Sequence, residues 1–158
     1  MKFRTWQERL ARKNKRAEKG LAIFGPKRKK KAAPSEWKRL VALLDNLTSS
    51  YVRLRDKRKN NGLCAICGNK PAGVAYHFIP RTRYATRFDP DNLCAACSSC
   101  NWGEKNNRLA YRDKHIAILG KEKYEALWAK ASKTAKFSTV ELKQMIIDIR
   151  KKLEEACL

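Results

Sequence analysis

The sequence predicts an α+β protein that is mostly helical, with amphipathic helices on both sides of a small ββα core. Two Cys-x-x-Cys pairs, Cys64 with Cys67 and Cys97 with Cys100, have the spacing of zinc ligands. Between the pairs lie 29 residues, which leaves room for a β-hairpin and a loop. Apolar residues recur at three- and four-residue spacing before and after this region. Residues 63–107 are therefore expected to form a zinc-bound treble clef.

The first segment, residues 1–34, is predicted to be a flexible basic arm. It holds 13 of the 37 Lys and Arg residues, including the run from Lys27 to Lys31, and glycine and proline punctuate it. At this charge density we expect the arm to follow phosphates, with Lys29 and Lys30 among the contacts. A tail that only adds solubility is the alternative.

A long amphipathic helix is predicted over residues 35–62. Ser35 follows Pro34 and is a good N-cap. The apolar stripe is expected to be core or a seam with a partner helix, and it is also the candidate interface of a homodimer. Its members are Trp37, Leu40, Val41, Leu44, Leu47, Tyr51 and Leu54.

Residues 108–158 are predicted to form further helices. Gly120 should end a short helix, and a second short helix should follow it. Ser138 and Glu141 have the spacing of a capping box, which predicts the start of a final amphipathic helix. Both short helices are expected to pack on the metal region.

The charge of the chain points to a polyanionic partner. In 158 residues, 37 Lys and Arg stand against 15 Asp and Glu, a formal net charge of +22, which nucleic acid would neutralise. The basic segments lack the broad apolar face of a membrane-surface helix, and no run approaches the roughly 18 apolar residues of a spanning helix. No export signal is recognisable, so we expect a cytoplasmic location without membrane partners.

Four thiolates would complete a tetrahedral zinc shell with no open position for water, so the predicted zinc site is structural. Cys94 lies three residues before Cys97 and competes as a ligand. Since Cys97 and Cys100 alone make a proper knuckle, Cys94 is assigned to packing. Cys157 is expected to be a free thiol.

Polar residues between and just after the cysteine pairs suggest a catalytic site. His77 is predicted on a strand, Asn92 on the following loop, and Asn101 at the start of the next helix. This order resembles the HNH endonucleases, in which two Cys-x-x-Cys pairs brace such a hairpin and helix. The resemblance implies that residues 63–107 form an HNH-like nuclease core.

Residues 36–155 resemble, more closely, the phage NinG (Rap) recombination endonucleases. The shared motifs, in order, are Arg87-Phe88-Asp89 with Asn92, Cys97-x-x-Cys100-Asn101, Asn107-Arg-Leu-Ala-Tyr111-Arg112 and Ile118-Leu119-Gly120. The resemblance implies cleavage of branched DNA, such as Holliday junctions and D-loops, in the cytoplasm of a phage-infected bacterium. Other phage recombination proteins are then possible partners.

If the resemblance holds, hydrolysis of a phosphodiester needs a base, a metal and phosphate ligands, and the resemblance implies a residue for each of these roles. His77 would be the general base, and Asn92 would orient that histidine or its loop by hydrogen bonding. The alternative for His77 is a histidine packed in the hairpin that caps a carbonyl or a phosphate without catalysis. Asn101 would bind one catalytic Mg²⁺ or Mn²⁺, with Asp91 or Asp89 as a further ligand if its loop folds inward. Neighbouring phosphates would be held by Arg81, Arg83, Arg87 and Lys105.

Two departures from the family pattern leave another function open. HNH enzymes often carry a metal ligand where this chain has Tyr76, and the NinG pattern suggests an acidic residue where it has Val74. A non-catalytic zinc protein that binds DNA or RNA is therefore the alternative, and a scaffold for another recombination protein is a third class. We further expect His115 at the surface and Trp102 in the core, with stacking on an unpaired base as the alternative for Trp102.

Overall fold

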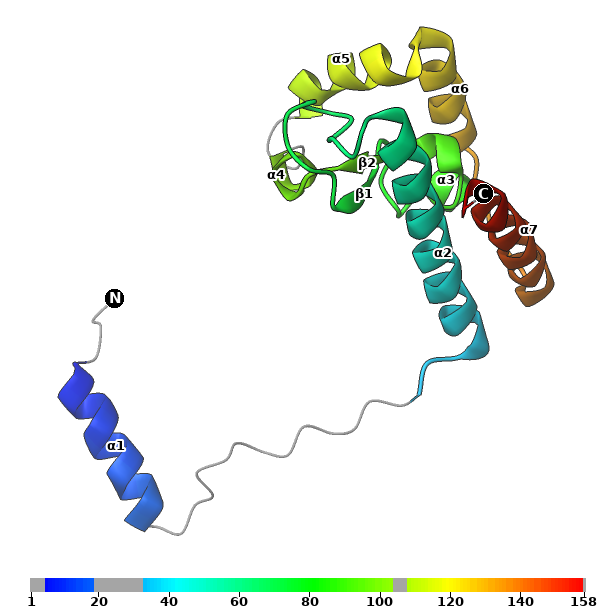
Figure 1. Cartoon of the computed structure of the whole chain (residues 1–158). Coiled ribbons are helices and arrows are strands. Elements are labelled where there is room, and N and C mark those ends of the chain that lie inside the picture. The colour runs from blue at the N-terminus through cyan, green and yellow to red at the C-terminus, as the bar shows by residue number, and fades with distance from the viewer. Residues whose placement is uncertain (1–4, 19–32, 104–107, 158) are drawn as a thin grey trace. The chain divides into compact units, whose positions relative to one another are not determined.

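The computed structural model of the chain describes residues 5–18, 33–103 and 108–157. The chain divides into two compact units, Met1–Ala33 and Pro34–Leu158. In the first unit, helix α1 spans Trp6–Glu18 (Figure 1). The backbone N–H of Thr5 donates to Glu8 Oε2 at 2.9 Å, and the N–H of Glu8 donates to Thr5 Oγ1 at 3.3 Å. This capping box begins a helix that was not predicted, because the many charged residues of this segment suggested a flexible arm.

The second unit is a mostly helical α+β structure with a small two-stranded sheet, as the sequence predicted. None of the helices among the described residues is long and apolar enough to cross a membrane. In order, the elements are α2 (Glu36–Lys59), β1 (Val74–His77), α3 (Tyr84–Arg87), the 3-10 turn η1 (Pro90–Asn92), β2 (Leu93–Ala96), α4 (Ser98–Gly103), α5 (Arg108–Leu119), α6 (Lys121–Ala131) and α7 (Thr139–Cys157).

Helices α2 and α7 lie side by side and bury their apolar stripes against each other (Figure 1). Val41 and Leu44 of α2 are buried with Leu142 and Ile146 of α7. The stripe suggested as a homodimer interface is therefore covered by a helix of the same chain. Burial of such side chains contributes about 1.5–3 kcal/mol each, so this pair is a main source of stability.

Both helices of this pair begin with the caps that the sequence predicted. The side chain of Ser35 accepts from the N–H of Lys38 at 3.4 Å. In the capping box of α7, the N–H of Ser138 donates to Glu141 Oε2 at 2.7 Å, and the N–H of Glu141 donates to Ser138 Oγ at 3.2 Å. These bonds satisfy backbone donors that a helix start would otherwise leave unpaired.

The two strands are antiparallel, and their register places His77 opposite Leu93 and Val74 opposite Ala96. One side of the sheet carries a core that we call the cysteine-side core. Helix α5 packs on that core through Tyr111, Ile118 and Leu119. The buried members of the cysteine-side core are Cys64, Ile66, Tyr76, Phe78, Cys94, Ala96, Cys97 and Cys100.

Helix α2 braces the hairpin from a different direction. The buried carboxylate of Asp56 accepts from the N–H of Ala95 at 2.7 Å and from Arg55 Nε at 2.7 Å. The guanidinium of Arg55 in turn donates to the carbonyls of Pro90 and Leu93, at 3.0 and 2.9 Å. These bonds fix both ends of η1 on α2.

The prediction for His115 was wrong, because α5 turns this residue into the cysteine-side core, where it is 4% exposed. Its Nε2 and the hydroxyl of Tyr76 share a hydrogen bond of 2.6 Å. Burial lowers the pKa of His115 to about 4. The sequence of α5 did not indicate which face of this short helix would pack on the sheet.

Candidate functional site

The first cysteine pair lies in a tight turn after α2. The N–H of Cys64 donates to the carbonyl of Lys70 at 2.8 Å, and the N–H of Gly68 donates to the carbonyl of Cys64 at 2.8 Å. Gly68 has φ +70°, a backbone conformation that glycine adopts without strain. The N–H of Ala65 bonds the carbonyl of Ala95 at 3.0 Å, which ties this turn to β2.

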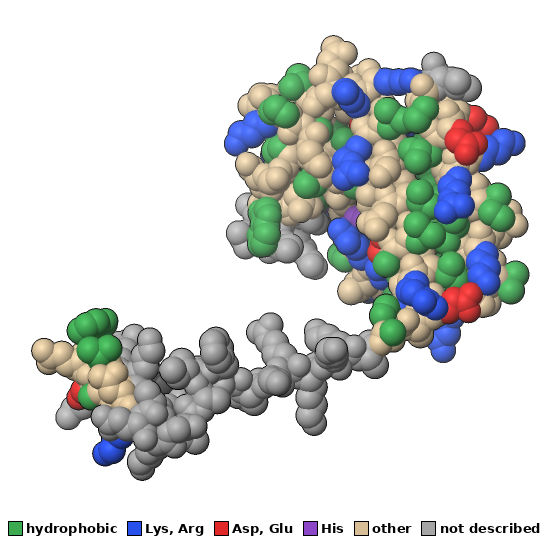
Figure 2. Space-filling view, turned by 60° about the horizontal axis from the view of Figure 1, so that its bottom comes forward, with side chains coloured by type: hydrophobic (Ala, Val, Ile, Leu, Met, Phe, Trp, Pro, Cys, Tyr) green, Lys and Arg blue, Asp and Glu red, His purple; other side chains and the backbone are tan. Residues whose placement is uncertain are grey.

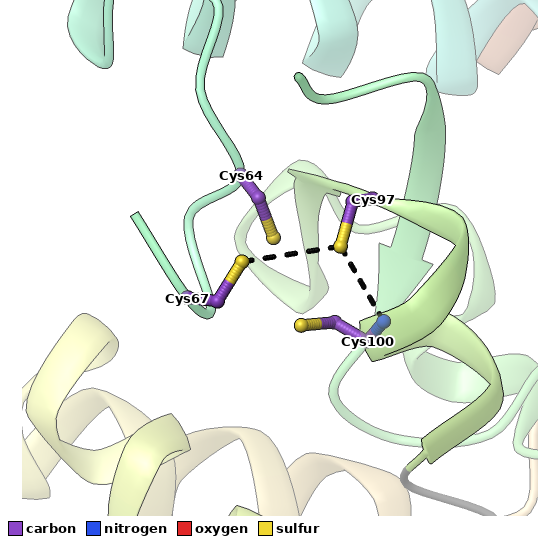
Figure 3. Close-up of side chains that lie close together, drawn as sticks. All are labelled: Cys64, Cys67, Cys97 and Cys100. Carbon is purple, nitrogen blue, oxygen red and sulfur yellow. Dashed lines mark hydrogen bonds between the residues drawn. The ribbon is translucent and has the colours of Figure 1, made fainter. Parts of the chain in front are cut away.

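The second pair stands where β2 passes into α4, and all four sulfurs point toward one centre (Figure 3). Their Sγ atoms lie within 4.8 Å of one another, and Cys67 Sγ is 3.9 Å from Cys97 Sγ. Ligands at about 2.3 Å from a tetrahedral zinc would be about 3.8 Å apart. The four cysteines, all free thiols, could therefore hold a metal ion such as zinc.

Backbone N–H groups favour the thiolate form of two of the four cysteines, whereas burial raises the pKa of Cys100 to about 12. The N–H of Asn69 lowers the pKa of Cys67 to about 7, and the N–H of Cys100 lowers the pKa of Cys97. Burial also raises the pKa of the Cys94 thiol, but Cys94 lies outside the group of four. Its assignment to packing agrees with its place in the cysteine-side core.

His77 ends β1 and is half-buried on the side of the sheet away from Tyr76, since successive strand residues point to opposite faces. Its Nε2 is 3.2 Å from the backbone carbonyl of Arg87. A carbonyl only accepts, so Nε2 carries the proton and Nδ1 keeps its lone pair. Burial, and then the charge of Arg81, lowers the pKa of His77 to about 4, so the ring is neutral at neutral pH.

Asn92 is fully buried and organises the loop between the strands, residues 78–92. Its Oδ1 accepts from the N–H of Ile79 at 2.8 Å, and its Nδ2 donates to the carbonyls of Ile79 and Thr86 at 3.0 and 2.9 Å. Its own carbonyl accepts from the N–H of Phe78 at 2.9 Å. Of the two roles predicted for Asn92, the described hydrogen bonds match the one that holds the loop.

Arg87 differs from the free phosphate ligand that the sequence suggested. Its guanidinium donates to both carboxylate oxygens of Asp45 on α2, at 3.0 and 2.6 Å, and lies 4.9 Å from the ring centroid of Tyr84. Because this fork already holds a carboxylate, Arg87 anchors α3 on α2. Its carbonyl is thereby fixed next to His77.

The other predicted phosphate ligands have different positions. Arg81 and Arg83 are exposed on the loop that follows His77. Lys105, like Lys29 and Lys30 of the arm, lies outside the described residues. Arg81 and Arg83 are thus the predicted phosphate ligands that the structure places at the surface, and the charge of Arg81 acts on His77.

The described hydrogen bonds of the predicted metal ligands go to groups other than His77. Asn101 follows Cys100 on α4, half-buried, with its N–H bonded to the carbonyl of Cys97 at 3.1 Å. Asp89 accepts from the N–H of Asp91 at 3.1 Å, and its carboxylate also pairs with Lys130 at 2.5 Å. The exposed Asp91 lines a pocket on the Arg55 side. The described contacts of both aspartates thus lie with the Lys130 and Arg55 sides of the loop.

Two aromatic neighbours of the predicted site lie in different environments. Tyr76 cannot join His77 at a metal, because its ring packs in the cysteine-side core against Phe78 and His115. Trp102, expected in the core, is 65% exposed at the end of α4. The described residues therefore leave an aromatic surface next to Asn101.

Sequence reasoning missed three residues that position the site, namely Asp45, Arg55 and Asp56 on α2. Their partners in the loop and in β2 are 35 to 42 residues away along the chain. An acidic residue beside an apolar stripe resembles any solvated helix position. Only the packing of α2 against the hairpin reveals these roles.

Comparison with known proteins identifies one family. The family model described as "Bacteriophage Lambda NinG protein" matches residues 2–157. No curated protein and no solved structure gave a match. The family match covers the cysteine cluster, His77 and all elements from α2 to α7.

Proposed function

The chain belongs to the NinG family of bacteriophage proteins, and from this premise we propose that it is a structure-specific endonuclease of phage recombination. Its substrates are branched DNA intermediates, Holliday junctions and D-loops, and its reaction is metal-assisted hydrolysis of a phosphodiester. In this proposal the hairpin, α4 and the cysteine cluster form an HNH-like treble clef. The catalytic centre lies at the loop end of the hairpin, around His77.

The observation that carries the proposal is the state of His77. Its Nε2 is committed to the carbonyl of Arg87 at 3.2 Å, and its pKa of about 4 keeps the ring neutral. The lone pair on Nδ1 is then available to accept a proton from an attacking water. The ring of His77 is held in place by two anchored elements. Arg87 anchors α3, and Asn92 anchors the loop.

The four cysteines support the proposal as the structural centre. Zinc fits this donor set because four thiolates close its coordination shell, so the ion stabilises the fold and supplies no open catalytic position. The turn at Cys64 and the start of α4 are short segments with little core of their own. Metal binding is therefore coupled to the folding of the hairpin that carries His77.

DNA binding rests on charge. Lys and Arg side chains are spread over the face of the second unit shown in Figure 2, with few acidic side chains among them. Arg81 and Arg83 are exposed on the loop after His77, and the charge of Arg81 acts on that histidine. Contacts of this kind hold the DNA backbone with little reading of bases, as recognition of a branched shape requires.

The donors for a catalytic Mg²⁺ or Mn²⁺ fit less well. Among the described residues, the carboxylate that acts on His77 electrostatically is Asp45, and it is bound to Arg87. The amide of Asn101 alone would hold such an ion weakly. We therefore derive no catalytic step through this metal.

That poor fit favours a second candidate function, a zinc-containing DNA- or RNA-binding protein without catalysis. It would share the charge, the cysteine cluster and the surface arginines. It predicts salt-sensitive binding of branched nucleic acid with no cleavage under any divalent metal.

The deciding experiment incubates purified zinc-loaded protein with labelled four-way junctions and with linear duplex, in magnesium, in manganese and in chelator. The His77→Gln variant is the test protein, and Gln retains a donor for the carbonyl of Arg87. We expect metal-dependent cutting of the junction by the wild type and its loss in the variant, with zinc content unchanged. Cutting by His77→Gln at the wild-type rate would rule out His77 as the base.

A further inference from the structure

A cavity of about 590 Å³ lies where α2, α3, α7 and the segment between α6 and α7 meet. Its deeper wall is apolar and includes Leu44, Phe88 and Ile149, each at most 5% exposed. A neighbouring hollow of about 360 Å³ shares Tyr84 and Phe137 with it. The two hollows together form a surface that we call the aromatic pocket.

Aromatic rings dominate this pocket. Phe88 stands 6.4 Å from Tyr84 and 6.1 Å from Phe137, measured between ring centroids, and Trp37 is 5.9 Å from Tyr84. Such rings offer flat faces on which another flat ring can stack. Helix α3 carries Tyr84 on the pocket and Arg87 beside His77, so one short helix borders both places.

One polar atom in the pocket wall lacks a partner. Thr48 is 1% exposed, and its Oγ1 makes no hydrogen bond with any described residue. A buried hydroxyl left unpaired costs about 1–3 kcal/mol. Thr48 lines the larger hollow, but its oxygen is closed off from solvent, so an occupant with a polar edge would satisfy this hydroxyl only after the side chain turns toward the cavity.

The rim of the pocket is positive. Lys133 and Lys152 line the larger hollow and Lys136 the smaller one, all exposed and without an ion-pair partner among the described residues. Lys130 is paired with Asp89, and Asp148 accepts from Gln144 at 3.0 Å. Asp148 keeps its negative charge, and three unpaired lysines against this one carboxylate leave the mouth net positive, which suits a phosphate.

We propose that the aromatic pocket receives an unpaired base from a branched DNA, with its phosphates on the rim lysines. A nucleotide has flat apolar faces, a polar edge and an anionic backbone, which matches the rings, Thr48 and the lysines in turn. Proteins that hold single strands combine these same two elements, a basic groove and aromatic stacking. The proposal rests on the proposed DNA-binding function and adds a site that distinguishes branched substrates by their unpaired bases.

The test compares two four-way junctions at chelated divalent metal, one fully paired and one with a single unpaired 2-aminopurine at the branch. Stacking of a base on aromatic side chains corresponds to a gain of about tenfold in affinity, so wild-type protein should bind the second junction about tenfold more tightly. Its 2-aminopurine emission should change on binding.

Two variants address the pocket without touching the site around His77. Ala135→Leu fills the space shared by both hollows, and Thr48→Val removes the hydroxyl while keeping the side-chain shape. Both should reduce the preference for the unpaired base and leave affinity for the fully paired junction unchanged. Lys143→Ala, on α7 outside the pocket, is the charge control and should keep the preference.

The outcomes separate this proposal from the proposed function. Equal affinity of wild-type protein for both junctions would overturn the pocket while leaving branched-DNA binding intact, and would favour an apolar peptide as its occupant. Survival of the preference in either variant would overturn it as well. Failure to bind both junctions would overturn the proposed function and this inference together.

Discussion

The guanidinium of Arg87 on α3 is fastened to the carboxylate of Asp45 on α2 by two hydrogen bonds of 3.0 and 2.6 Å. The backbone carbonyl of Arg87 lies 3.2 Å from His77 Nε2. A side-chain ion pair between two helices thereby sets the orientation of a ring on β1. This relationship links the stability of the fold to the geometry of the candidate site.

Asp45→Asn should lower the free energy of unfolding, because Arg87 loses its charged partner while remaining partly buried. Both side chains are 17% exposed, which places the loss between surface and buried pairs, at about 1–3 kcal/mol. Urea denaturation measures it. The exposed pair of Lys143 and Glu36 is the control, and Glu36→Gln should cost far less than Asp45→Asn, because solvent screens an exposed ion pair. Equal costs would contradict the anchoring role.

Metal analysis should find one zinc per chain, held by the four cysteines. Cys67→Ser should lose the zinc and much of the helical signal in circular dichroism, since folding here depends on the metal. Cys94→Ala should keep the zinc, because Cys94 lies outside the group of four. Loss of zinc in Cys94→Ala, with retention in Cys67→Ser, would reverse the assignment of ligands.

Asn92→Asp should destabilise the protein by about 2–4 kcal/mol, because a carboxylate cannot donate to the carbonyls of Ile79 and Thr86 and would be buried. Thermal unfolding measures the effect. Asn101→Ala is the comparison, since Asn101 is half-buried on α4, and it should change stability by less than about 0.5 kcal/mol. A stable Asn92→Asp protein would show that the loop does not depend on these bonds.

Acid should destabilise the fold partly through His115. Its pKa is about 4 in the folded chain and about 6.5 when unfolded, so the unfolded chain binds more protons between these values. The stabilisation is present above pH 6.5 and is lost as the pH falls toward 4. By pH 5, His115 should account for about 2 kcal/mol.

The measurement is the free energy of unfolding of wild type and His115→Gln from pH 7.5 to 5. Gln can still pair with the hydroxyl of Tyr76 but does not titrate in this range. The variant should show a shallower decline, and comparison of the two curves cancels the acid loss of zinc that both share. Parallel curves would mean that His115 is not neutralised by burial.

Arg81→Ala combined with Arg83→Ala should weaken junction binding without lowering thermal stability, because both side chains are exposed. If each contacts one phosphate, the slope of log affinity against log salt should become shallower by about 2. Fluorescence anisotropy over a salt series gives the slope. An unchanged slope would remove these two arginines from the DNA interface.

Much of the fold follows from local pattern. The apolar spacing in α2 and α7, the N-cap at Ser35, the capping box at Ser138 and the stop at Gly120 were all predicted and are all present. Each depends on residues at most a few positions apart, and such signals survive in a single sequence. The helix α1 was missed although Thr5 and Glu8 carry the same cap signal, because the surrounding charge suggested an extended arm.

The sequence by itself identified the four cysteines as the candidate metal ligands, because ligand spacing and thiol chemistry are properties of short segments. Only the tertiary structure decided which way the polar side chains face. It placed His115 in the core, joined Arg87 to Asp45, and turned Asp89 toward Lys130. These outcomes depend on contacts between segments about 40 residues apart, where a one-residue change of register or helix rotation would exchange buried and exposed faces.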